Sequence, residues 1–172
     1  MKIVEKNDTL VITEFSEMEA YQIACTIEKD GLRFYRRLLQ DEQSPDAKKT
    51  LEFMIAEEQR HLRFFEDRLR AQEQKADLDA AANDILDSLD YGVFAPYQNM
   101  AELEKILTDA KKVLRLGIRV EEKTRQFYEL CRDQVTSTAV RKELARIIDE
   151  EGKHRALLQE RLQQIEQGSV QS

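Results

Sequence analysis

Four stretches of the sequence repeat their apolar residues at the three- and four-residue spacing of an amphipathic α-helix. Residues that commonly cap helices stand where these stretches begin. Ser16 and Asn99 are each followed three residues later by a glutamate, which is the spacing of a capping box. Ser44 precedes Pro45, and proline suits the first position of a helix. We therefore expect four long helices, over residues 16–41, 44–72, 99–132 and 136–167.

The lengths of the connections predict how these helices pack. Only a few residues join the first helix to the second and the third to the fourth, so each pair should be an antiparallel hairpin. The connection over residues 73–98 is much longer, and an apolar face within it predicts a short helix. We expect an all-α four-helix bundle over residues 16–167, made of two helical hairpins with one long crossover. Residues 1–15 should form an N-terminal arm, either a short hairpin or disordered, and residues 168–172 a C-terminal tail.

The composition agrees with this fold and narrows the choice of partners. Of the 172 residues, 41% are hydrophobic and 35% are charged, with only 5 glycines and 2 prolines, which suits long amphipathic helices. A net charge of −7 without a cluster of Lys and Arg argues against nucleic acid and anionic membranes as partners. No apolar run is long enough to cross a bilayer, and the first residues lack the apolar core of a signal peptide. Cys25 and Cys131 form no Cys-x-x-Cys pair, so we expect a cytoplasmic protein without disulfides.

The chain repeats itself at an offset of 93 residues, without insertion or deletion. Its two histidines, His61 and His154, are equivalent under this offset, as are the Phe-Tyr pairs at 34–35 and 127–128. Each histidine lies three residues after a glutamate, within EEQRH in the first half and EEGKH in the second. A pseudo-twofold axis should therefore relate two copies of one helical hairpin.

A glutamate or a Glu-x-x-His pair interrupts the mostly apolar stripe of each predicted helix. Four carboxylates buried together would repel one another and lose their hydration, so positive charge must offset them. The only basic residue at a matching stripe position is Arg125, where the first half has Leu32. Two divalent metal ions balance four carboxylates, and a Glu-x-x-His pair directs both of its side chains to one ion. The candidate ligands are Glu28, Glu58, His61, Glu121, Glu151 and His154.

The arrangement of IEKDGLRFY, EEQRH, VEEKTRQFY and EEGKH resembles the ferritin-like superfamily, and within it the rubrerythrin-type proteins, over residues 16–165. The resemblance implies that the six candidate residues bind two iron ions, although manganese and zinc also suit such ligands. The chain departs from rubrerythrins in having Thr124 where they carry an additional ligand glutamate, and in lacking paired Cys-x-x-Cys motifs for a rubredoxin domain. The symmetric ligand set is closer to that of bacterioferritin, but Gln59 stands where bacterioferritins have a haem-ligating methionine.

Several residues near the candidate ligands have two interpretations. Glu121 competes with Glu122, but Glu121 is equivalent to Glu28 and lies seven residues before a tyrosine. Tyr35 and Tyr128 are either core aromatics or groups that hydrogen-bond a ligand carboxylate or donate an electron.

Four further positions beside the ligands are also open. Glu57 and Glu150 either orient the histidine of the opposite half or are surface charges. Gly31 and Thr124 lie one turn after the glutamates of their helices. Their small side chains predict either a space where O₂ or peroxide meets the metals or close packing of helices.

The resemblance leads to a ranked set of functions. The leading hypothesis is a non-haem di-iron oxidoreductase of rubrerythrin type that reduces H₂O₂ or O₂ with electrons from an external donor. The main alternative is iron oxidation and storage, which needs a hollow shell of many chains. The acidic chain and its short C-terminal tail favour a homodimer instead. An O₂-dependent hydroxylase and a metal-free helical interaction module are further alternatives.

Overall fold

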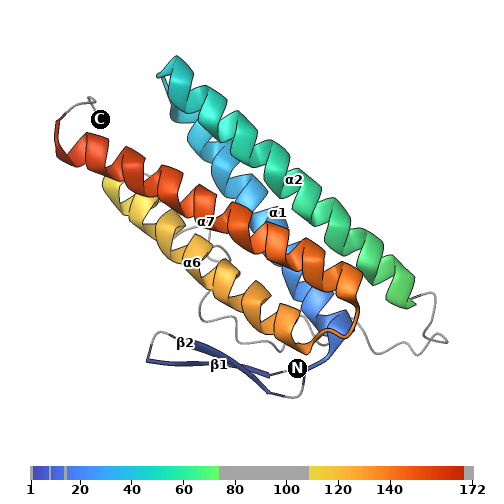
Figure 1. The fold of residues 1–172 in the computed structure, drawn as a ribbon. Coiled ribbons are helices and arrows are strands. Elements are labelled where there is room, and N and C mark those ends of the chain that lie inside the picture. The colour runs from blue at the N-terminus through green and yellow to red at the C-terminus, as the bar shows by residue number, and fades with distance from the viewer. Residues whose placement is uncertain (1, 8, 14, 74–108, 169–172) are drawn as a thin grey trace. The chain divides into compact units, whose positions relative to one another are not determined.

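The computed structural model describes residues 2–7, 9–13, 15–73 and 109–168 (Figure 1). These residues form four long α-helices and a two-stranded sheet. The helices are α1 (Glu17–Asp41), α2 (Pro45–Glu73), α6 (Ala110–Gln134) and α7 (Thr138–Glu166), and the strands are β1 (Lys2–Lys6) and β2 (Thr9–Thr13). Residues 74–98 of the predicted crossover, with its short helix, and residues 169–172 of the predicted tail lie outside the described residues.

Three of the helices begin where the capping pattern predicts. The Ser16 hydroxyl oxygen accepts a hydrogen bond from the backbone N–H three residues later, and Ser137 does the same at the start of α7. Pro45 is the first residue of α2 and follows Ser44, whose hydroxyl also accepts a backbone N–H. These contacts satisfy amide groups that have no partner within the first turn of a helix.

Helix α6 begins later than predicted. Asp109 has an extended backbone and caps this helix, because its carboxylate accepts the backbone N–H groups of Lys111 and Lys112 at 3.0 and 3.1 Å. The predicted start at Asn99 is therefore wrong for α6, although Asn99 itself lies outside the described residues. A carboxylate also interacts favourably with the positive end of the helix dipole, so Asp109 is a favourable cap.

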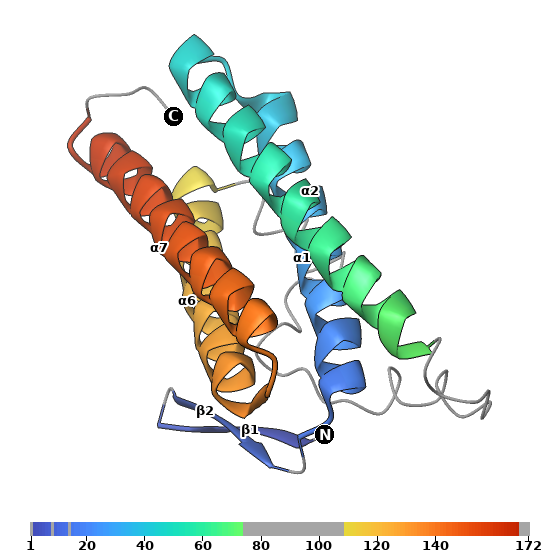
Figure 2. The same cartoon turned by 45° about the vertical axis from the view of Figure 1, so that its right-hand side comes forward.

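The helices pack as two antiparallel pairs, α1 with α2 and α6 with α7 (Figures 1 and 2). This arrangement confirms the all-α class and the helix pairing expected of a four-helix bundle. Contacts divide the chain into two compact units, of which the first contains α1 and α2 and the second contains β2, α6 and α7. The repeat is also visible in the helix bounds, because each helix of the second pair begins and ends 93 residues after its counterpart, as Glu17 and Ala110 do.

Each helix pair buries its apolar stripe. In the first pair the stripe includes Ile23, Phe34, Met54 and Phe65, and in the second pair Val113, Phe127, Leu144 and Ile147. Burying one such side chain fully contributes about 1.5–3 kcal/mol, so these stripes hold each hairpin together. None of the described helices combines the length and apolar character needed to cross a lipid bilayer.

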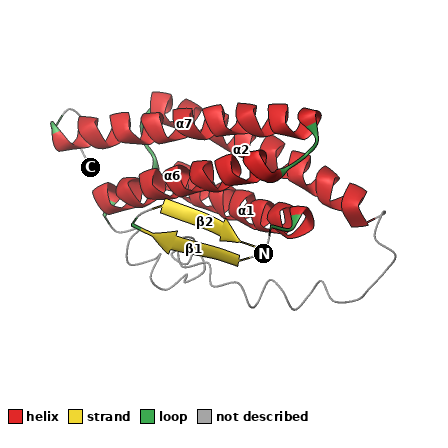
Figure 3. Ribbon diagram, turned by 60° about the horizontal axis from the view of Figure 1, so that its bottom comes forward, coloured by secondary structure: helices red, strands yellow, loops and turns green. Residues whose placement is uncertain are grey.

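The N-terminal segment forms a β-hairpin, which is one of the two structures predicted for it (Figure 3). Asn7 lies in the connecting turn with a φ of 50°, a left-handed conformation that asparagine tolerates better than most residues. Along β2, Leu10 is buried and Val11 is exposed, as expected for a strand with one covered face. Strand β2 packs against α6, so the hairpin covers part of the second unit.

Candidate metal centre

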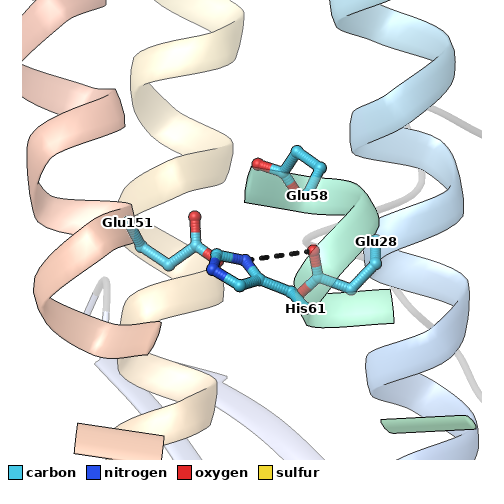
Figure 4. Close-up of side chains that lie close together, drawn as sticks. All are labelled: Glu28, Glu58, His61 and Glu151. Atoms are coloured by element: carbon cyan, nitrogen blue, oxygen red, sulfur yellow. Dashed lines mark ion pairs between the residues drawn. The ribbon is translucent and has the colours of Figure 1, made fainter. Parts of the chain in front are cut away.

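The first helix pair brings together Glu28 of α1 with Glu58 and His61 of α2 (Figure 4). All three side chains are buried, and Glu28 and His61 are fully enclosed at 0% exposure. Each offers a donor atom, and these atoms lie within 4.8 Å of one another. The nearest approach given by an ion pair is 3.6 Å, between His61 Nδ1 and Glu28 Oε2, which is longer than a hydrogen bond. We call these residues the first triad.

Arg60 of α2 contacts the histidine of the first triad. Arg60 Nη2 lies 3.3 Å from His61 Nε2, and a guanidinium has only N–H donors. The Arg60 guanidinium therefore lies against the Nε2 edge of the His61 ring, while Nδ1 faces Glu28. Arg60 is the residue that sequence analysis missed here, because its position next to a histidine gives no sign of the direction of its side chain.

Gly31 of α1 provides the space for the Glu58 carboxylate. A Cβ atom at position 31 would lie 3.1 Å from Glu58 Oε2 and 3.4 Å from its carboxyl carbon. The Glu58 carboxylate lies beside Gly31, and a space for O₂ or peroxide next to this glycine stays a prediction. Its counterpart Thr124 is buried in the second unit.

The second helix pair repeats the arrangement with Glu121 of α6 and Glu151 and His154 of α7. These three side chains, which we call the second triad, are also buried. His154 Nδ1 lies 3.2 Å from Glu151 Oε2 and 4.0 Å from Glu121 Oε2, and the three donor atoms again lie within 4.8 Å of one another. In each half, the i, i+3 spacing places a Glu-His pair on the buried face of one helix, and the partner helix supplies the other glutamate.

The donor chemistry of both triads fits a metal ion. Two carboxylates and one imidazole are oxygen and nitrogen donors that iron, manganese and zinc share. Buried carboxylates require a compensating positive charge, since losing their hydration is costly. Donors bound to one ion at about 2 Å lie roughly 3–4 Å apart, and the observed limit of 4.8 Å needs only a small closure.

Glu121, and not the adjacent Glu122, is the glutamate that lies with the second triad. The Glu121 side chain is 8% exposed, whereas the Glu122 side chain is 27% exposed. Glu122 forms ion pairs with Arg125, at 3.1 Å, and with Arg155. Arg125 also binds Glu129 at 2.7 Å. Arg125 thus pairs with Glu122 and Glu129 of its own helix.

Tyr35 and Tyr128 are buried, each beside a phenylalanine of its own helix. The ring centroids of Phe34 and Tyr35 are 5.3 Å apart, and those of Phe127 and Tyr128 are 5.5 Å apart. Both tyrosines therefore belong to the core, which is the first of their two interpretations. Their part in the chemistry of the site stays a prediction.

Glu57 and Glu150 are not simple surface charges. The Glu150 side chain is buried and its carboxylate lies 3.2 Å from Arg146 Nη1. Glu57 is largely covered and lies 3.5 Å from Arg60 Nη2. Each carboxylate thus pairs with an arginine of its own helix, and a role in orienting a histidine stays a prediction.

Two buried charges had no place in the sequence interpretation. Asp30 of α1 and Lys123 of α6 are both buried and are equivalent under the repeat. Burial raises the pKa of Asp30 above its ordinary value of 3.8, and the Arg33 guanidinium at 2.8 Å opposes that shift. The charge pattern alone does not distinguish these two buried residues from the exposed charges beside them. The available signal was that the repeat pairs an aspartate with a lysine at this position.

Comparison with known proteins agrees with this geometry. The rubrerythrin family model matches residues 4–86, which include α1, α2 and the whole first triad. The resemblance to rubrerythrin-type, ferritin-like proteins is therefore confirmed over this segment. No curated protein and no solved structure matches the chain. The second triad is connected to the matched segment through the internal repeat and its equivalent helix bounds.

Proposed function

We propose that the two triads together form one dinuclear iron centre with four glutamate and two histidine ligands. On this basis the protein is a non-haem di-iron oxidoreductase of rubrerythrin type that reduces H₂O₂ or O₂. The observation that carries the proposal is the presence of the same buried Glu-Glu-His triad in both halves of the repeat. The rubrerythrin match over the first half supports iron as the metal.

Charge balance is the main reason to combine the triads. Each triad holds two carboxylates, so the pair matches the charge of two divalent ions, and carboxylates are able to bridge metals roughly 3.5–4 Å apart. His61 and His154 would each serve a different ion, because each belongs to a different Glu-x-x-His pair. Two ferrous ions supply the two electrons that, with two protons, convert H₂O₂ to two molecules of water.

The protein's own residues shape the environment of this chemistry. The buried apolar stripes keep bulk water from the triads and so strengthen electrostatic interactions within them. Arg60 lies against the Nε2 edge of the His61 ring and limits how far that ring turns. We propose that the phenol groups of Tyr35 and Tyr128 donate a proton or an electron. We expect an external electron donor to reduce the iron ions again.

The decisive experiment measures metal content and peroxide consumption together. Protein loaded with Fe(II) under anaerobic conditions should bind about two ions per chain and consume about one H₂O₂ for every two Fe(II) oxidised. His61→Ala and His154→Ala should each bind about one ion fewer. Less than one ion per chain in the unaltered protein, or full retention of both ions in either variant, would contradict the proposed centre.

The size of the particle separates reduction from iron storage. Light scattering of the loaded protein should give a dimer, since two-fold dimers are the commonest soluble assemblies. An assembly of a dozen or more chains that accumulates many ferric ions would instead indicate that the triads oxidise iron for storage. Turnover of an organic substrate with O₂ would instead indicate a hydroxylase.

A further inference from the structure

The two triads have different surroundings, and the difference begins at Gly31. This glycine lies inside α1, one turn after Glu28 and opposite Glu58 of α2. A Cβ atom added at position 31 would lie 3.1 Å from Glu58 Oε2 and 3.4 Å from its carboxyl carbon. Ordinary contacts between a Cβ and another heavy atom begin near 3.4 Å, so the Glu58 carboxylate occupies space that any side chain at position 31 would claim.

Glu58 has little freedom to move away from such a side chain. It is 4% exposed, and its carboxylate already lies within 4.8 Å of the donor atoms of Glu28 and His61. A shift of a few tenths of an ångström would therefore displace one donor of the first triad. Because Glu58 is a proposed ligand, a side chain at position 31 that displaces its carboxylate would change how an ion is held.

The second triad is built differently at the equivalent position. Thr124 is buried where the first half has Gly31, and Glu151 Oε2 lies 3.2 Å from His154 Nδ1. This half accommodates a β-branched side chain while keeping its three donors within 4.8 Å of one another. The close contact at this position is thus a feature of the first half, whereas the second half holds a larger side chain there.

We propose that Gly31 is a positioning residue, which sets the place of the Glu58 carboxylate and thereby the affinity of the first triad for its metal ion. The inference rests on the metal function proposed above and adds that the two ions are held by non-equivalent sites. Gly31 touches no metal itself and acts through Glu58.

The test compares two Gly→Ala changes, both inside helices and both near a triad. Gly31→Ala introduces a methyl group against Glu58, whereas Gly152→Ala introduces one that meets no atom within 4 Å. Anaerobic titration with Fe(II), monitored by calorimetry, should show that Gly31→Ala lowers the affinity for Fe(II) on the order of tenfold. Both ions of Gly152→Ala should bind as in the unaltered protein.

A double-mutant cycle distinguishes positioning from a general effect on folding. Glu58→Asp retracts the carboxylate by one methylene, so its effect on affinity in the Gly31→Ala background should differ from its effect in the glycine background. Additive effects, or equal affinities in Gly31→Ala and the unaltered protein, would overturn the role of Gly31 while leaving the metal centre intact. Failure of the unaltered protein to bind Fe(II) would instead overturn the proposed function, and with it this inference. Melting of the metal-free variants serves as the folding control.

Discussion

Exchanging one of two adjacent glutamates in α6 tests the metal centre most directly. Glu121→Gln removes a negative donor from the second triad but keeps the shape of the side chain. Glu122→Gln makes the same chemical change one residue later, at a side chain that pairs with Arg125 and Arg155. Only the first change should affect stabilisation by metal, because only Glu121 lies with Glu151 and His154.

The expected magnitude follows from binding linkage. An ion present at 100 times its dissociation constant stabilises the folded state by about 2.7 kcal/mol. For a chain of 172 residues, each kcal/mol changes the melting temperature by about 2–4 °C. One ion should therefore raise the melting temperature by about 5–11 °C, and two ions by about twice that amount. The ion pairs of the partly exposed Glu122 contribute about 0–1 kcal/mol each, with or without metal.

Differential scanning calorimetry with and without Fe(II), under anaerobic conditions, measures these shifts. The unaltered protein and Glu122→Gln should show the full metal-dependent increase in melting temperature. Glu121→Gln should lose about half of the metal-dependent increase in melting temperature. The loss should be larger if the Glu121 carboxylate binds both ions. The metal-free Glu121→Gln protein should melt no lower than the unaltered one, because a buried negative charge has been removed.

Equal metal-dependent shifts in the two variants would refute the assignment of Glu121. The absence of any shift in the unaltered protein would refute metal binding at the triads altogether. A loss confined to Glu122→Gln would mean that the ion is bound at the more exposed face of α6.

Three further predictions concern other parts of the chain. Gly152→Ala should raise the free energy of unfolding by up to about 1 kcal/mol in chemical denaturation, since alanine is favoured over glycine inside a helix and the added methyl group meets no atom within 4 Å. The N–H groups of the first turn of α6 lower the pKa of Asp109 below its ordinary value of 3.8. The charge of Asp109 therefore stabilises the fold above pH 3.8, and this stabilisation is lost as the pH falls through the lower pKa of the folded state. Melting curves of the metal-free protein and of Asp109→Asn should differ at neutral pH and converge in acid. Burial raises the pKa of Cys25 to about 11 and that of Cys131 well above its ordinary 9.0, so mass spectrometry should detect alkylation of either thiol at pH 8 only after denaturation.

The candidate ligands were predictable because they break an otherwise regular pattern. A glutamate inside an apolar helical stripe is unfavourable unless something compensates it, and here that anomaly occurs twice at one offset. The helix starts at Ser16 and Ser44 were predictable for a similar reason, since a capping side chain acts within a single turn of the chain.

Features that depend on the direction of a side chain were not predictable. The close approach of Glu58 to Gly31 involves two different helices, and helical spacing does not fix where a flexible carboxylate ends. The same holds for Arg60, whose guanidinium lies against His61. The start of α6 was missed because Asp109 is followed three residues later by Lys112 and so lacks the capping-box spacing that pointed to Asn99.

The contact between β2 and α6 has a consequence for the order in which the protein is made. Strand β2 leaves the ribosome before any of the described helices, but the helix it packs against begins only at Ala110. Helices α1 and α2 are complete before α6 has been synthesised, so the first hairpin is able to fold while the chain is still growing. The N-terminal strands can pack only after α6, which is distant in sequence, has been synthesised. We expect formation of this contact to be the slow step in folding of the second unit.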